Sequence, residues 1–475
     1  AENASLLTSG AFTIARAVNV RAGNTGIITI GGSGANASVY SGAVTLSKAA
    51  NFTAIASGSS TFSGVVSGAG TLTKTGAGLV VLSGANTFAG AVTVSAGSLR
   101  LSNAAALGTN AAVGMTAAGT TLELQGGITV ASGKTLTMNS NTTGDLRSTF
   151  LNGASNNTWN SNIVAAGTGL VQVNAASGTT MTIGGTVTST GGAGTGTLFT
   201  RGAGVVNYTG TIDLGADRIF NKTDAGTVIV SSTGNTWVRT QVADGQIQLG
   251  ISNALDTGKE FTFGQNAAGS GRLELNGFNQ VVARLNTFST STGSHTLRNS
   301  NTAAASTLTF STPASTTDIL KNVQIQGTYS GSGTLHLVSN GTGRTEFESG
   351  LFAADSLTVN AGTVAFTGNA SRNVGGPITG AASATVEKLG TGTLTSINDW
   401  DNLGTTNLVA GNLVLSNGSS GALNVATGTT LTAGLAGGVM SLSSLNFASG
   451  ATTFSPIIGA PSIVAPISAT TVNAA

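Results

Sequence analysis

The chain has few of the residues on which most catalytic and metal sites depend. It has no cysteine, which excludes disulfide scaffolds, thiolate metal ligands and cysteine nucleophiles. Charged residues make up 8% of its 475 residues, whereas about 25% is typical of globular domains. So few charges cannot cover the surface of a conventional domain. Small residues such as Ala, Ser, Thr, Asn and Gly must therefore form most of the exterior.

The charge balance identifies no partner. The 19 Lys and Arg residues nearly cancel the 17 Asp and Glu residues, and they form no basic run or stripe. This excludes the usual surface for binding nucleic acid. No uncharged apolar run reaches the ~18 residues of a membrane span, so we predict none. The sequence opens without a basic and apolar leader, which predicts an exported chain whose signal peptide has been removed.

What the chain does have is glycine and alternating apolar residues. There are 70 glycines, and 40% of all residues are hydrophobic, which is too many for a disordered segment. Stretches such as 99–101 (LRL), 122–124 (LEL) and 273–275 (LEL) place apolar side chains on one face of a strand and polar ones on the other. The sequence therefore predicts half-buried β-strands around a thin core.

A short unit of strand, glycine and strand recurs without a gap. Its four clearest copies are 92–101, 240–249, 357–366 and 406–415, with glycines at Gly97, Gly245, Gly362 and Gly411. We expect these glycines to adopt positive φ, so that the chain turns a corner between strands. Such a unit fits a stack of hairpins or a coil of parallel strands. The coil is favoured because only four Asn-Gly pairs, the strongest hairpin signal, occur in the chain.

One segment resembles a known family. Residues 64–108 contain a Gly-rich start, the step Leu72-Thr73-Lys74-Thr75-Gly76 and then LSGANTF, and they resemble the autotransporter-associated β-strand repeat. Divergent copies lie at 226–255, 333–368 and 386–417. The resemblance implies an all-β, elongated right-handed parallel β-helix displayed at a bacterial surface. Autotransporters that carry such passengers end in a membrane β-barrel, for which the sequence shows no pattern. We therefore expect either a passenger separated from its barrel or a surface protein of the kind that has none.

The C-terminal segment differs in composition. We predict a continuous solenoid over 1–450 and an extended tail over 451–475, because three of the five prolines fall in this tail and proline removes ladder donors. One alternative is a cap or linker. The other is an arm that docks on a neighbouring subunit, with these assembly residues: Pro456, Ile457, Ile458, Pro461, Ile463, Val464, Pro466 and Ile467.

The sequence offers few candidates for catalytic, metal-binding or sugar-binding residues. Asp399 and Asp401 are the best calcium candidates, and the acid pairs 213/217 and 346/348 are weaker ones. Each pair reads more simply as part of a solvated loop or strand face. The two histidines, His295 and His336, are distant in sequence and predict no metal site. The three tryptophans, Trp159, Trp237 and Trp400, can stack on sugars or pack in the core. We predict no catalytic residue, no cofactor and no enzyme activity.

These features predict a structural subunit. It is expected to be an exported β-solenoid whose partners are copies of itself, assembled head to tail into an extracellular filament, sheath or layer on a bacterial cell. The alternative is a monomeric adhesin or autotransporter passenger that binds surface glycans. A β-helix polysaccharide lyase or hydrolase is the distant third interpretation.

Overall fold

A computed structural model gives the fold. It describes residues 2–23, 25–139, 147–192, 196–265, 268–348, 350–416, 418–433, 440–450, 452–456 and 467–474. The chain comprises two compact units, Ala1–Val238 and Arg239–Ala475, and each is described by itself. No α-helix occurs in the described ranges; one 3-10 turn, η1 (Thr328–Ser330), is present in the second unit.

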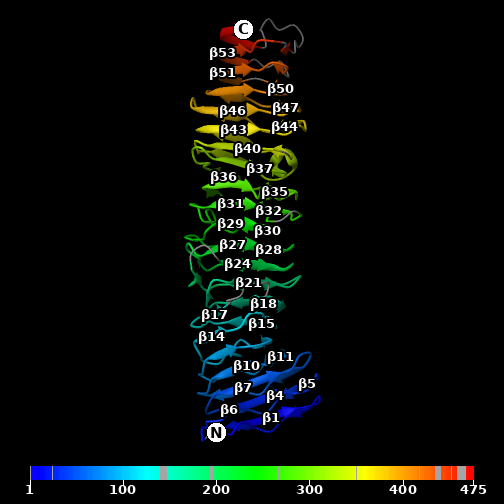
Figure 1. Cartoon of the computed structure of the whole chain (residues 1–475), viewed down its shortest axis with the longest axis vertical. Coiled ribbons are helices and arrows are strands. Elements are labelled where there is room, and N and C mark those ends of the chain that lie inside the picture. Colours follow the sequence, from blue (N-terminus) through cyan, green and yellow to red (C-terminus); the bar gives the residue numbers. More distant parts are fainter. Residues whose placement is uncertain are drawn as a thin grey trace. The chain divides into compact units, whose positions relative to one another are not determined.

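The first unit is a stack of parallel coils (Figure 1). One of its faces is a ten-stranded parallel sheet. In stacking order its strands are β1 (Ala4–Thr8), β4 (Ile28–Gly32), β7 (Ala50–Ala54), β10 (Leu72–Thr75), β12 (Val92–Val94), β14 (Ala112–Met115), β17 (Thr135–Asn139), β20 (Asn162–Ala166), β23 (Val187–Ser189) and β26 (Ile212–Asp213). Strands of the adjacent face include β11 (Leu79–Leu82) and β13 (Ser98–Leu101), which pair in parallel. Each strand therefore lies against its counterpart one coil away, as in a β-solenoid.

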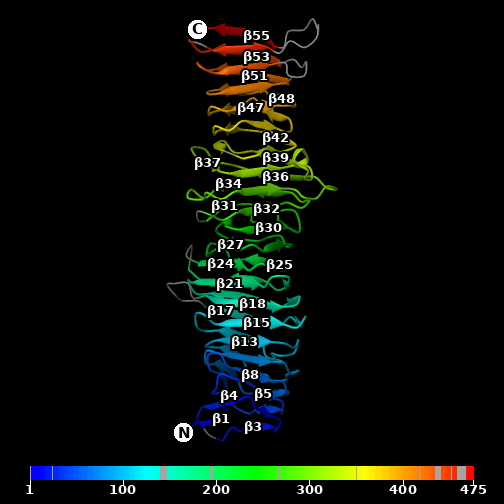
Figure 2. The same cartoon turned by 90° about the vertical axis from the view of Figure 1, so that its right-hand side faces the viewer.

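The second unit repeats this plan. Figure 2 shows three of its terminal strands, β51, β53 and β55, stacked in parallel. They belong to an eight-stranded sheet: β37 (Thr317–Leu320), β40 (Arg344–Phe347), β43 (Gly362–Phe366), β46 (Ala384–Lys388), β49 (Thr405–Leu408), β51 (Gly418–Val425), β53 (Met440–Phe447) and β55 (Ile467–Ala474). A second face includes β42 (Ser356–Val359), β45 (Ile378–Gly380) and β48 (Trp400–Asn402). The predicted all-β parallel solenoid is confirmed.

The core is built by stacking like residues. Leu72 pairs with Val92, and Val92 with Val113, and all three side chains are buried. Aromatic rings stack in the same way, with 4.8 Å between the ring centroids of Tyr40 and Phe62, which pair in register on adjacent coils. Because each coil buries its apolar side chains against its own faces and against the neighbouring coils, the hydrophobic contribution of about 25 cal/mol per Å² is spread along each unit.

The glycine of the recurring unit turns the corner, as predicted. Gly97, Gly245, Gly362 and Gly411 have φ of 60°, 71°, 70° and 72°. At Gly97 the coil below also approaches closely, since an added Cβ would lie 2.6 Å from the carbonyl oxygen of Gly78. Both the backbone conformation and this contact therefore require glycine.

Buried lysines hold the carbonyls of several turns. The Lys74 ammonium donates to the backbone oxygens of Thr75, Gly76 and Ala96 at 2.9, 2.7 and 2.8 Å. The Lys388 ammonium donates to Leu389, Gly390 and Ala410 at 2.9, 2.7 and 3.2 Å. Both side chains are buried, and burial lowers the pKa of each to about 8. The third acceptor lies on the next coil, so each lysine also ties two coils together.

A three-residue step of Asn, Thr and an aromatic residue, 86–88 (NTF) and 235–237 (NTW), has a similar role. Asn86 and Asn235 each accept, through their side-chain oxygen, a backbone N–H of the preceding coil at 2.8 and 2.7 Å. Asn157 does the same for Ile128 at 2.7 Å and begins a third copy, 157–159 (NTW), that the sequence analysis missed. The aromatic residue that ends each copy is fully buried. The motif therefore satisfies a backbone donor where the ladder is interrupted.

Candidate functional site

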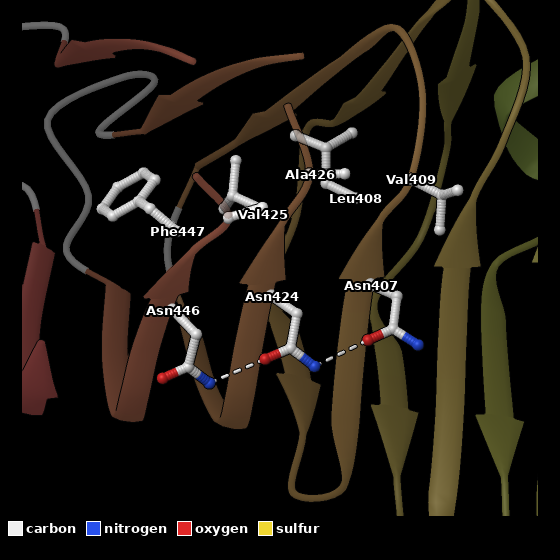
Figure 3. A pocket seen from close by; sticks show the side chains of 9 residues that line it. Asn407, Leu408, Val409, Asn424, Val425, Ala426, Asn446 and Phe447 are labelled. Atoms are coloured by element: carbon white, nitrogen blue, oxygen red, sulfur yellow. Dashed lines mark hydrogen bonds between the residues drawn. The ribbon is translucent and has the colours of Figure 1, made fainter. Parts of the chain in front are cut away.

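An asparagine ladder runs along the outer face of the last coils. Its members, Asn407, Asn424, Asn446 and Asn473, occupy equivalent positions on β49, β51, β53 and β55. Each amide nitrogen donates to the side-chain oxygen of the asparagine one coil earlier, at 2.8, 2.7 and 2.7 Å. Figure 3 shows two of these bonds. Parallel in-register pairing creates the ladder, because it stacks residues that lie 17, 22 and 27 positions apart.

The ladder has a fixed direction. Its first member, Asn407, donates to a carboxylate oxygen of Glu387 on β46 at 3.1 Å. The other carboxylate oxygen of Glu387 accepts from the Arg344 guanidinium at 2.6 Å. Because a carboxylate is acceptor-only, all the amide donors point toward it. Aligned amides polarise one another, so the charge-assisted bond at one end strengthens the series.

A shallow pocket lies beside the ladder. It has a volume of about 360 Å³, and Figure 3 shows the side chains along its wall. Its lining residues are Asn407, Leu408, Val409, Asn424, Val425, Ala426, Asn446, Phe447 and Ala448. Val409, Ala426 and Ala448 each follow a ladder asparagine by two positions, and Val409 is 45% exposed. The ladder is thus bordered by an apolar strip.

This surface carries no charge. From Asn402 to Ala475 the sequence contains no Asp, Glu, Lys, Arg or His. Acid-base chemistry and carboxylate or imidazole metal binding therefore have no participant there. The surface offers amide hydrogen bonds and van der Waals contact, which suits recognition of another surface.

The two predicted calcium candidates, Asp399 and Asp401, lie on either side of Trp400 and make different contacts. The Asp401 carboxylate accepts the backbone N–H and the hydroxyl of Ser419 at 2.8 and 3.3 Å. The backbone oxygen of Asp399 accepts the N–H of Ile378 at 3.0 Å. Across the described ranges, no three Asp, Glu, His or Cys side chains are grouped so that they could hold a metal ion.

Most of the predicted assembly residues lie outside the described residues. These are Ile457, Ile458, Pro461, Ile463, Val464 and Pro466. Pro456 ends β54 (Thr453–Pro456), which pairs with β52 (Thr430–Ala433), and Ile467 begins β55, which pairs with β53. The described parts of the 451–475 tail thus extend two sheets of the second unit. Docking of this tail on a neighbour stays a prediction.

The remaining candidates are accounted for by packing. Trp159, Trp237 and Trp400 are at most 1% exposed, so they cannot stack on a sugar in this structure. Two of the weaker acid candidates have nearby partners. Glu346 forms an ion pair with Arg344, and the Asp213 carboxylate accepts a hydrogen bond from the Thr236 hydroxyl.

A buried serine and histidine form the most enzyme-like pair. The Nε2 atom of His295 lies 2.9 Å from the Ser291 hydroxyl oxygen, while its Nδ1 accepts the N–H of Gly271 at 3.1 Å. That contact fixes the proton of the neutral ring on Nε2, so His295 donates to the hydroxyl and cannot accept its proton. Both side chains are buried. The pair is therefore structural.

The stacked coils and the uncharged ladder define a class, the β-solenoid repeat protein. Within it, residues 72–101 match the family model of the passenger-associated-transport-repeat, inside the 64–108 segment that carried the resemblance. In this segment and in its parallel solenoid fold, the chain is similar to autotransporter passenger-like repeat proteins. No curated protein and no solved structure matches the chain.

The repeat family suggests a surface or secreted protein and is generally non-enzymatic. In the described part of the chain, no helix is long and apolar enough to cross a membrane.

The ladder was missed by the sequence analysis, although a signal was present. Each rung is an asparagine near the end of a strand, as in 406–409 (TNLV), 423–426 (LNVA), 445–448 (LNFA) and 472–475 (VNAA). Uneven coil lengths hide the repeat from a search at a fixed period.

Proposed function

We propose that the chain is a non-catalytic, exported structural subunit that self-assembles into a bacterial cell-surface filament, sheath or layer by head-to-tail stacking of coils. The observation that carries the proposal is the additive ladder. Each coil adds a parallel strand and one asparagine rung to the coil before it, so a coil of a second copy can add the next rung. Asn/Gln ladders stabilise stacked strands of separate chains in the same way.

Composition supports assembly as well. Natural strand edges usually carry charges that oppose pairing, and β49 to β55 contain no charged residue. A head-to-tail contact joins two different surfaces and does not close on itself, so it produces a polymer.

The test is negative-stain imaging of this 475-residue chain, beside a variant truncated after Gly450, which lacks β54 and β55. We expect regular fibres from the full chain and loss of fibres in the variant. Single particles from the full chain, or unchanged fibres after truncation, would overturn the head-to-tail proposal. Degradation of a polysaccharide by the purified chain, in a reducing-end assay, would overturn the non-catalytic part.

A monomeric adhesin that binds glycans is the second candidate. It is favoured by the match to a passenger-associated repeat and by a groove of about 520 Å³ on the outer face of β42, β45 and β48. Thr358, Asn360, Thr379, Asp401 and Ser419 contribute hydroxyl, amide and carboxylate groups to this groove, which are the groups that bind sugar hydroxyls. Glycan-array binding by single particles that is lost in Asp401→Ala, but not in an outward Thr363→Ala control, would support this candidate.

A further inference from the structure

The eight-stranded sheet changes character along its outer face. Its earlier rungs carry Arg344, Glu346 and Glu387, which are linked by ion pairs. From β49 onward the outward positions hold only uncharged residues. In register order they are Thr405, Ala422, Ser444 and Thr471 on one side of the ladder, and Val409, Ala426 and Ala448 on the other. We call the outer surface of β49, β51, β53 and β55, including these residues, the neutral face.

The neutral face has unused hydrogen-bonding capacity of both kinds. A side-chain amide has two N–H donors and an oxygen with two lone pairs. Within the ladder, Asn424 uses one donor toward Asn407 and one lone pair toward Asn446. One donor and one lone pair of Asn424 remain. Asn446 keeps one lone pair, and its second N–H donates to the Ser444 hydroxyl at 3.3 Å, which leaves that hydroxyl free to donate its own proton. The flanking side chains are short, so a second surface can approach these amides closely.

We propose that the neutral face is a lateral contact surface for the neutral face of a second copy of this chain. This lateral contact joins copies side by side within the assembly proposed above, so it rests on the proposed function. In a two-fold contact the same patch occurs on both partners. A patch with net charge then meets its own sign, whereas a patch with equal donors and acceptors and no charge complements itself.

The argument selects this face over the earlier rungs of the same sheet. A copy of Arg344 or Glu387 placed against a second copy would have to exchange or desolvate its ion pair, at a cost that such pairs rarely recover. The strip at Val409 and Ala426 adds apolar area that gains from burial. An amide ladder with an apolar border is also the composition of dry interfaces between stacked sheets.

The test places a charge on the face without touching the ladder. Ala426→Asp and Ala426→Lys leave every asparagine bond in place. Thr367→Asp and Thr367→Lys are matched controls, because Thr367 follows β43 at the corresponding position, outside the neutral face. Circular dichroism and thermal melts establish that all variants fold. Sedimentation velocity at several concentrations measures self-association, and negative-stain imaging shows whether filaments lie side by side.

We expect the native chain and both controls to associate laterally. Each Ala426 variant should associate at least about tenfold more weakly, since like charges facing each other cost on the order of 1 kcal/mol or more. Mixing Ala426→Asp with Ala426→Lys should restore association, because the opposed charges then attract.

The outcomes separate the two proposals. Unbundled single filaments from the Ala426 variants would support both the lateral face and the head-to-tail function. Unchanged side-by-side association of these variants, or no rescue on mixing, would overturn the neutral face while leaving head-to-tail assembly standing. Monomers of the native chain at every concentration would overturn both.

Discussion

The buried lysines predict an unusual dependence of stability on pH. Lys74 and Lys388 are buried, and each ammonium donates to three backbone carbonyl oxygens. Burial lowers the pKa of each ammonium from 10.5 to about 8. The unfolded chain therefore keeps these protons to higher pH than the folded chain does. Since stability rises with pH wherever the unfolded state binds more protons, the folded state should gain stability between about pH 8 and pH 10.5.

The magnitude follows from the two pKa values. At about pH 9.5 each lysine should contribute roughly 2 kcal/mol more to the free energy of unfolding than at pH 7. Tyr40 and Tyr208 oppose this trend only near and above pH 10, because burial raises their pKa in the folded chain. Lys74 lies in the first unit and Lys388 in the second, so each reports on its own unit.

The assay is urea unfolding at pH 7, 8.5 and 9.5, for the native chain and for Lys74→Met and Lys388→Met. The native chain should become more stable as pH rises. Each variant should show a smaller rise in stability with pH than the native chain. Each should also be less stable at pH 9.5, because the two N–H donors of the neutral lysine amine are lost to the turn carbonyls. A native stability that is flat or falls from pH 7 to 9.5, or a rise in both variants equal to that of the native chain, would refute this account of the lysines.

Three further predictions concern single positions. Asn424→Ala removes two ladder bonds, and we expect it to lower the free energy of unfolding of the second unit by about 1–2 kcal/mol. Ala422→Ser, beside it, should change this free energy little. Equal effects of the two variants in urea titrations would mean that the ladder does not stabilise the coils. Gly97 has a positive φ of 60° and lies close to the Gly78 carbonyl, so Gly97→Ala should lower the free energy of unfolding by more than about 1 kcal/mol. Gly114→Ala, with open space around its added Cβ, should leave it nearly unchanged. A Gly97→Ala chain as stable as the native one would contradict the corner geometry. Burial lowers the pKa of His295, and its neighbours Ser291, Gly271 and Phe263 supply no anion. The folded state thus resists protonation of this ring, so the stability of the chain should fall as pH drops below about 6.5. Thermal melts at pH 7 and pH 5 should show a smaller loss of stability in acid for His295→Gln.

Local patterns predicted much of this protein. The alternation in 99–101 and 122–124 required half-buried strands, and the glycine of the recurring unit required a corner of positive φ, because both follow from the geometry of a few consecutive residues. The Leu-Thr-Lys-x-Gly step indicated the repeat family for the same reason, since the lysine reaches carbonyls one and two residues ahead. The lack of charge after Asp401 was also visible in the sequence. The sequence did not reveal that these uncharged residues form one outer surface of stacked strands.

Only the tertiary structure decided which residues meet across coils. Asn407, Asn424, Asn446 and Asn473 form one ladder because irregular corners, with 17 to 27 residues between rungs, still return each strand to the same register. A fixed-period search cannot find such a register, since strand pairing is set by burial of the core and not by chain length. For the same reason the tryptophans, open candidates in the sequence, are core residues in the fold. The sequence thus determined the coil, and stacking of the coils determined the surface that the chain presents to a partner.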